Sequence, residues 1–257
     1  MKLRSLTLAV LSLTTVTTFA ASKLSTSSQK ATFSSTQKNA IEKIVHGYLV
    51  KHPEVLVEAS QALQAKQAQQ QQSEAMKAIE ANKRQLFNDP NTPTAGNPNG
   101  NVYFVEFFDY QCGHCREVYK VVKNIMAKDS NVKFIFKELP IFGGPSKYAA
   151  KAALAANKEG KYLELHNKLF ESQEMLTQAK IKTYITSINL DVDKLTREMQ
   201  NPKYEKDIRG NFALAQKLGI MGTPAFVISN KAETRFQFIP GAASEQRLQA
   251  AIQAVQK

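Results

Sequence analysis

The residues whose types and spacing most clearly suggest chemistry are Cys112 and Cys115, the only cysteines in the 257-residue chain. A Cys-x-x-Cys pair can ligate zinc, attach haem, form a structural disulfide or act as a dithiol catalyst. Zinc needs about four ligands, and only His114 lies close to the pair in the sequence. Haem attachment needs a histidine after the second cysteine, where this chain has Arg116. A disulfide this short restrains the unfolded chain little. The pattern therefore favours a dithiol catalyst with no metal and no cofactor beyond its own disulfide.

The sequence around the pair predicts a strand, a turn and a helix. Residues 102–111 read VYFVEFFDYQ, and residues 112–125 read CGHCREVYKVVKNI, with apolar residues at helical spacing. Cys112 would begin the helix, where free N–H groups and the helix dipole stabilise a thiolate, and we expect it to be the exposed nucleophile. Cys115, one turn deeper, would resolve the mixed disulfide. We expect His114 to place its imidazole near the thiolate; the alternative is an ordinary exposed turn residue.

Glu106 is the one charged residue in the predicted strand before the pair. Strand alternation places it on the same face as Phe104 and Phe108, so we expect a buried carboxyl group with a raised pKa unless it is paired. Lys137, at the end of the neighbouring predicted strand, is the candidate partner. Two interpretations stay open: Glu106 relays a proton to or from Cys115, or it belongs to a structural ion pair.

A loop far along the chain has the features of a substrate-binding backbone. Met221-Gly222-Thr223-Pro224 directly precedes an apolar predicted strand. A proline at a strand start, after a glycine-containing turn, is a candidate for a cis peptide bond. If this loop folds against the cysteines, the backbone of Thr223 is free to pair with an extended substrate. We therefore expect Thr223 and Pro224 to contribute to substrate binding.

The first residues indicate export. Lys2 and Arg4 precede an uncharged apolar stretch and then small residues, which predicts that residues 1–20 are a cleaved signal peptide. Residues 21–35 are polar and are predicted to be flexible. Outside the cytosol disulfides persist. A bacterial periplasm fits best, and a peripheral association with the outer membrane stays open.

The charge of the chain argues against nucleic acid as a partner. The formal net charge is +12, and it falls to +10 once Lys2 and Arg4 are removed. The basic residues are spread along the chain and form no basic run. Two cysteines cannot staple a chain of this length, so the fold must depend on a hydrophobic core.

Residues 36–87 predict two helices. The first would be capped by Ser35 or Thr36, and the second would begin at Pro53 and continue as a long exposed helix rich in Ala, Gln, Glu and Lys. A short apolar helix joined to such a stalk is marginal alone. We therefore predict a homodimer through residues 36–63; the alternative is that this segment folds back on its own chain.

The remaining sequence predicts one domain. Residues 88–101 are rich in Pro, Gly and Asn and are predicted to be a linker. Residues 102–257 then read strand, helix, strand, a helical block at about 146–218, two strands and a helix. This order predicts an α/β thioredoxin-like fold with a helical insertion. The helical dimerisation segment would precede it.

These motifs together resemble the DsbA-like branch of periplasmic thiol-disulfide oxidoreductases. EFFDYQCGHC, FKELPIFG, the helical block and GTPAFVI carry the resemblance, which covers about residues 96–257. It assigns attack to Cys112, resolution to Cys115, the cis-proline loop to Thr223 and Pro224, and the buried acidic position to Glu106. It also implies unfolded or misfolded exported proteins as substrates and a membrane redox partner of the DsbB or DsbD type.

Three departures from the DsbA pattern point toward isomerisation. The dipeptide Gly113-His114 resembles protein disulfide isomerase, whereas DsbA-type oxidases usually carry Pro-His. Thr223 before the proline resembles the isomerase DsbC. The N-terminal extension resembles DsbC, ScsC and DsbA-like proteins of intracellular pathogens, which use such a segment to oligomerise. We therefore predict a protein that forms or isomerises disulfides, or does both. A monomeric oxidase or reductase is the alternative, and a chaperone or surface-associated structural protein is an alternative of another class.

Overall fold

The computed structural model describes residues 33–257. The predicted signal peptide and residues 21–32 of the predicted flexible stretch lie outside this range. The chain divides into two compact units between Ala59 and Ser60, and each unit is described by itself. In the described residues, no helix combines the length and the apolar character that a membrane crossing requires.

The first unit contains helix α1 (Ser35–Lys51) and the start of helix α2 (Glu54–Ala81). Ser34 caps α1, one residue before the predicted cap. Its hydroxyl accepts a hydrogen bond from the backbone of Gln37, and the Gln37 side chain accepts one from the backbone of Ser34. This reciprocal capping box explains the shift, because the glutamine must lie three residues after the cap. The second helix begins directly after Pro53, close to the predicted position.

Helix α1 buries none of its residues. Ile41, Ile44, Val45 and Tyr48 recur at helical spacing and are all exposed. The helix therefore presents an exposed apolar face.

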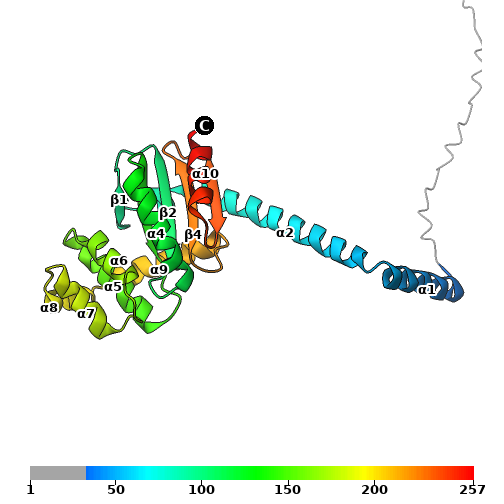
Figure 1. Ribbon diagram of the computed structural model, residues 1–257, viewed down its shortest axis with the longest axis horizontal. Helices are drawn as coiled ribbons and strands as arrows, with labels where there is room; N and C mark the ends of the chain where they lie inside the picture. Colours follow the sequence, from blue (N-terminus) through cyan, green and yellow to red (C-terminus); the bar gives the residue numbers. More distant parts are fainter. Residues whose placement is uncertain (1–32) are drawn as a thin grey trace, which may run out of the picture. The chain divides into compact units, whose positions relative to one another are not determined.

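Within residues 60–257 the strands form one five-stranded mixed sheet of order β1-β3-β2-β4-β5 (Figure 1). The strands are β1 (Thr94–Gly96), β2 (Val102–Phe108), β3 (Val132–Glu138), β4 (Ala225–Asn230) and β5 (Phe236–Pro240). The β2–β3 pair is parallel and the other neighbours are antiparallel. Every residue of the central strand β2 is buried, which explains its almost uninterrupted apolar sequence. The predicted α/β thioredoxin-like fold is confirmed.

Helices α4 (Gly113–Lys128) and α10 (Glu245–Gln256) lie side by side over one face of the sheet (Figure 1). The core on this face includes Phe104, Phe134 and Phe226 from three neighbouring strands. The helical insertion also packs on this core. It comprises α5 (Gly144–Lys158), α6 (Tyr162–Phe170), α7 (Gln178–Ser187), α8 (Val192–Glu198) and α9 (Pro202–Lys217).

The opposite face of the sheet corrects the prediction of one exposed stalk helix up to residue 87. Helix α2 ends at Ala81, and a separate short helix, α3 (Lys83–Phe87), follows it. Ala75 and Ile79 of α2 are buried with Leu86 and Phe87 of α3 in a core that covers this face. The sheet is apolar on both faces, and these residues of α2 and α3 shield the second face from water.

The predicted linker, residues 88–101, contains strand β1 and is therefore more than a linker. Strand β1 pairs antiparallel with β3, so that Ala95 lies opposite Phe134. Gly96 ends the strand with φ +75°, and a Cβ there would lie 2.5 Å from the carbonyl oxygen of Val132. Only glycine fits this close approach.

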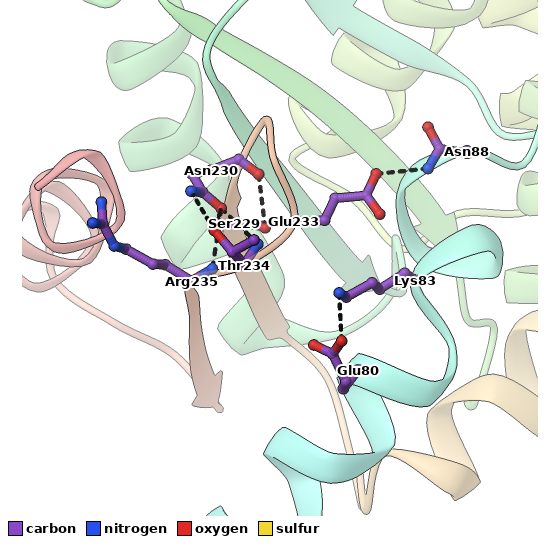
Figure 2. Close-up of polar contacts among 8 residues, drawn as sticks. All are labelled: Glu80, Lys83, Asn88, Ser229, Asn230, Glu233, Thr234 and Arg235. Carbon is purple, nitrogen blue, oxygen red and sulfur yellow. Dashed lines mark hydrogen bonds and ion pairs between the residues drawn. The ribbon is translucent and has the colours of Figure 1, made fainter.

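A hydrogen bond from Asn88, the residue after α3, reaches the β4–β5 turn, and further polar contacts hold each side of it (Figure 2). The side chain of Asn88 donates to Glu233 Oε1 over 2.7 Å, and Lys83 pairs with Glu80. Asn230 Oδ1 closes the turn by accepting from the backbone of Thr234 at 2.9 Å. The segment before the sheet is thus attached to it by hydrogen bonds as well as by apolar packing.

Candidate active site

The two cysteines lie where the strand-to-helix prediction placed them. Cys112 is the N-cap residue of α4, with extended backbone angles, and Cys115 lies in the first turn of the helix. Both are free thiols. Cys115 is completely buried, as expected, but the prediction that Cys112 is exposed is wrong, because only 4% of its surface is accessible. The backbone of Thr223 lies against its sulfur and covers it.

The two thiols differ strongly in acidity. The Cys115 thiol donates to Cys112, and together with the side chain of Thr223 and the backbone N–H groups of Cys115 and His114 it lowers the pKa of Cys112 to about 5, against the effect of burial. Burial, followed by the hydrogen bond to Cys112, raises the pKa of Cys115 far above its ordinary value. The N-terminus of α4 therefore stabilises a thiolate on Cys112 only.

His114 contributes to the thiolate through its backbone. Its imidazole is largely exposed, and its Nδ1 lies 3.2 Å from Glu117 Oε2 in the same helical turn. The imidazole was expected near the thiolate; in this structure its partner is Glu117. Gly113, between Cys112 and His114, is the first residue of α4 and has open space around its Cα.

The proline loop meets the cysteines because of the register of the sheet. Strand β4 begins at Ala225, which pairs with Phe107 near the end of β2. The loop before β4 and the turn after β2 therefore lie at the same end of the sheet. The Thr223–Pro224 peptide bond is cis, as the sequence predicted. The carbonyl oxygen of Thr223 lies 3.2 Å from Cys112 Sγ.

Glu106 is buried, and burial raises its pKa to about 8. The predicted pairing of Glu106 with Lys137 is wrong. In the β2–β3 register Lys137 lies opposite Phe107, so its side chain points to the other face of the sheet.

Lys137 instead anchors the segment before the sheet. Its Nζ donates to the carbonyl oxygen of Gln85 and to Thr92 Oγ1, each over 2.6 Å, and lies 3.6 Å from Asp89 Oδ2. Burial lowers the pKa of Lys137 to about 8, while Asp89 acts in the opposite direction.

Sequence reasoning missed a second buried acid, Glu138, the last residue of β3. Its Oε1 accepts hydrogen bonds from the hydroxyls of Tyr110 and Tyr162, each over 2.8 Å. Burial raises the pKa of Glu138 to about 8. The signal was the motif FKELPIFG, but an acid at the end of a predicted strand is ordinarily interpreted as exposed.

In the described part of the chain, no three His, Cys, Asp or Glu side chains gather in a way that could hold a metal ion.

Residues 104–253, more than half of the chain, match the family model described as the DSBA-like thioredoxin domain. The chain belongs to this family. Residues 37–70 also match the N-terminal domain of copper resistance protein ScsC, so the helical segment before the DSBA-like domain has relatives of its own.

Solved structures resemble the chain over most of its length. BcfH from Salmonella enterica Typhimurium is 29% identical with a TM-score of 0.74, covering 86% of this chain and 97% of that chain. ScsC from Proteus mirabilis in a transitional conformation is 30% identical with a TM-score of 0.62 over the same shares. A thioredoxin-like oxidoreductase from Silicibacter pomeroyi is 39% identical with a TM-score of 0.63, covering 67% of this chain and 96% of that chain.

Curated relatives are more distant. The chain is 25% identical over 132 residues to the Na(+)/H(+) antiporter NhaA 3 of Salinispora tropica, which is 51% of this chain and 20% of the antiporter. The chain thus spans about a fifth of the length of that relative. The thiol:disulfide interchange protein DsbA of Bordetella pertussis is 22% identical over 157 residues, which cover 59% of this chain and 75% of that protein.

Proposed function

We propose that this protein is an exported, homo-oligomeric thiol-disulfide oxidoreductase that forms or isomerises disulfides in unfolded or misfolded exported proteins. The observation that carries the proposal is the asymmetry of the two thiols. At neutral pH Cys112, with its pKa near 5, is a thiolate, whereas Cys115, with its strongly raised pKa, stays protonated. A thiolate that is stable when reduced is also a good leaving group, so the disulfide of this pair oxidises other thiols readily.

In disulfide formation, a client thiolate attacks the Cys112 sulfur of the oxidised pair. A client–Cys112 disulfide forms, and Cys115 leaves as a thiolate that takes up a proton. A second client thiolate then attacks the client sulfur of the mixed disulfide. Cys112 leaves as its stabilised thiolate, and the client has gained one disulfide while the pair has gained two electrons.

In isomerisation, the Cys112 thiolate attacks a client disulfide and releases one client thiolate. That thiolate attacks another disulfide of the same client, and a client thiolate finally displaces Cys112. The electron count of the pair does not change, so this reaction starts from the dithiol form.

Glu106 is the proposed proton relay for Cys115. Its side chain points to the sheet face whose core includes Phe104, Phe108 and Cys115, and with a pKa of about 8 it is a neutral acid at pH 7. A neutral acid can give a proton to the Cys115 thiolate as it leaves and take it back when the disulfide reforms.

The surroundings of Cys112 suit an unfolded client. The backbone of Thr223 lies at the sulfur and is placed to pair with an extended chain. Met221, two residues earlier, is 98% exposed. Phe142, whose backbone N–H donates to Asp109 in the turn before the cysteines, is 55% exposed. Such apolar side chains next to a reactive sulfur would contact apolar segments that only unfolded proteins expose.

The cellular setting follows from the sequence. The signal-peptide pattern supports a periplasmic location, where a membrane partner of the DsbB type would keep the pair oxidised or one of the DsbD type would keep it reduced. The match of residues 37–70 to an ScsC N-terminal domain supports an assembly of several copies, of which a homodimer is the simplest.

The proposal is tested with purified mature protein and three variants, Cys112→Ser, Cys115→Ser and the double variant. Oxidation of a reduced client and reactivation of a client with scrambled disulfides are measured separately, which also gives the direction of the reaction. We expect Cys112→Ser and the double variant to be inactive and Cys115→Ser to accumulate a client-bound mixed disulfide. The absorbance of the thiolate at about 240 nm should titrate near pH 5 in the reduced wild type. Full client recovery with the double variant would refute the proposal and favour a chaperone.

A further inference from the structure

A buried polar cluster beside the cysteines has no part in the steps above. Glu138 is 1% exposed, and its Oε1 accepts from both Tyr110 Oη and Tyr162 Oη at 2.8 Å. Tyr110 Oη also lies 3.2 Å from Nδ1 of the buried His166. Two hydroxyl donors that converge on one carboxyl oxygen in a dry site form a fixed arrangement. Removal of the acceptor would leave the Tyr162 hydroxyl unsatisfied and would leave Tyr110 with only the longer contact to His166.

Through Tyr110 the cluster contacts the turn directly before Cys112. Tyr110 lies two residues before the cysteine, and its ring is held by Glu138. Its carbonyl oxygen accepts from Arg116 Nε of helix α4 at 3.0 Å. The backbone N–H of Cys112 donates to the carbonyl oxygen of Asp109 at 3.1 Å, which closes the turn. The turn before the nucleophile is therefore held twice: Glu138 binds the side chain of Tyr110, and Arg116 of α4 binds its backbone carbonyl.

The cluster also contacts the helical insertion. Tyr162 and His166 both belong to α6. The backbone carbonyl of Glu138 also accepts from Asn211 Nδ2 of α9 at 3.0 Å. A single residue at the end of β3 thus contacts the active-site turn and two helices of the insertion.

Burial keeps the cluster neutral. Burial raises the pKa of Glu138 to about 8 against the hydrogen bonds from the two tyrosines, and the nearby acids Asp109 and Glu106 add to the rise. Burial lowers the pKa of His166 to about 3. The cluster therefore adds no full charge beside Cys112 at neutral pH, and its influence on the sulfur is one of position.

We propose that Glu138 is a positioning residue for Cys112. Through the hydroxyl of Tyr110 it fixes the turn that places the cysteine at the N-terminus of α4, and through the hydroxyl of Tyr162 it ties that turn to the insertion. The inference rests on the proposed function, because Cys112 is the reacting atom in that function. Loss of the arrangement should misalign Cys112 with the N–H groups that stabilise its thiolate.

The test is the thiolate titration of Cys112 in the reduced full-length mature protein. We expect Glu138→Leu and Tyr110→Phe to raise the titration midpoint by about one pH unit. The rate of attack on a small aromatic disulfide at pH 5 should fall about two-fold, because the thiolate fraction falls about five-fold while the nucleophilicity of the thiolate rises about 2.5–3-fold. Glu138→Gln keeps an oxygen that can accept both hydroxyls, so its midpoint should stay much closer to that of the wild type.

The matched control is Tyr204→Phe, which also removes a tyrosine hydroxyl that donates to a glutamate, here Glu198 at 2.9 Å. It should lose stability without any change in the Cys112 midpoint. If Glu138→Leu does not fold, Tyr110→Phe and Tyr162→Phe decide the question. Midpoints equal to that of the wild type in the folded variants would overturn this inference alone. A wild type without thiol exchange would overturn the proposed function instead.

Discussion

Glu106 illustrates what burial does to one acid in this fold. It pairs with Phe136 and Phe226 on the neighbouring strands, and burial raises its pKa from 4.5 to about 8. The folded protein therefore binds this proton more tightly than the unfolded chain does. The resulting contribution to stability is fully present below pH 4.5 and is lost as the pH rises toward 8.

Glu106→Gln should remove this pH dependence. Relative to the wild type, the free energy of unfolding of the reduced variant should increase by about 2–4 kcal/mol between pH 4.5 and pH 7, because each pKa unit corresponds to about 1.4 kcal/mol. Urea unfolding of both proteins at the two pH values measures this difference. The contribution of Cys112 cancels because both proteins contain it, and that of Glu138 cancels except for the part of its raised pKa that Glu106 causes. A difference that does not change with pH would show that Glu106 is not a buried neutral acid. An unchanged thiol-exchange rate and pH profile would eliminate its proposed role as a relay.

The sequence predicted part of this site for identifiable reasons. The placement of Cys112 and Cys115 and the burial of Glu106 follow from local patterns that a strand and a helix impose. The side of the sheet on which Lys137 lies depends on the register between two strands, which a single sequence does not contain. Glu138 was missed because the tyrosines that bury it come from a turn and from a helix 24 residues later.

At the scale of elements, the start of helix α4 determines the chemistry of Cys112. Gly113 occupies the first helical position, and a Cβ there would meet nothing within 4 Å. The N–H groups that lower the pKa of Cys112 belong to His114 and Cys115. Cys112 has ψ 121°, which is compatible with a following proline. A proline at residue 113 would therefore fit the backbone conformation, would meet no neighbouring atoms and would remove none of the N–H groups that act on Cys112.

Gly113→Pro should stabilise the reduced protein by about 0.4–1 kcal/mol, because proline lowers the entropy of the unfolded chain. The thiolate titration of Cys112 should remain near pH 5, since both backbone donors are retained. Urea unfolding and absorbance at about 240 nm measure the two effects. The matched control is Gly210→Pro, also in open space but in the middle of α9, which should destabilise by about 3 kcal/mol. A Gly113→Pro variant as unstable as this control would contradict the helix start described above.

The elements that the sequence predicted well are recognisable from their own residues. Strand β2 is apolar except for Glu106, β3 contains the apolar run Phe134–Phe136, and β4 begins with the apolar run Ala225–Ile228. Such runs are recognisable without tertiary information. Strand β1 is the tripeptide Thr-Ala-Gly, and it becomes a strand only through its pairing with β3. The burial of Ile79 likewise depends on a sheet face that forms far along the chain.

At the scale of the whole molecule, the boundary between the units differs from the predicted linker. A truncation near residue 96 would remove α3 and β1 together with Ile79 and Leu86. The apolar sheet face that these residues cover would then be exposed. The second unit instead begins at Ser60. A fragment that tests the catalytic unit alone should therefore start near that residue, and self-association is better tested in the full mature chain.

The exposed face of α1 predicts that the chain without its predicted signal peptide, residues 21–257, is an oligomer. Burial of one large apolar side chain is worth about 1.5–3 kcal/mol, so Ile44→Asp should break the association. We expect its mass in solution to be that of one chain. Asn39→Asp adds the same charge on the opposite side of α1 and should leave the oligomer intact.

Both variants keep the second unit unchanged, so their exchange with a small disulfide should match that of the wild type. Reactivation of a scrambled client should fall only in Ile44→Asp, because a client with several wrong disulfides benefits from two reactive sulfurs held at high effective concentration. Light scattering and the two activity assays on the same samples separate these effects. A wild type that is monomeric at micromolar concentration would contradict the role assigned to α1. An Ile44→Asp monomer with full isomerase activity would show that each chain reshuffles disulfides alone.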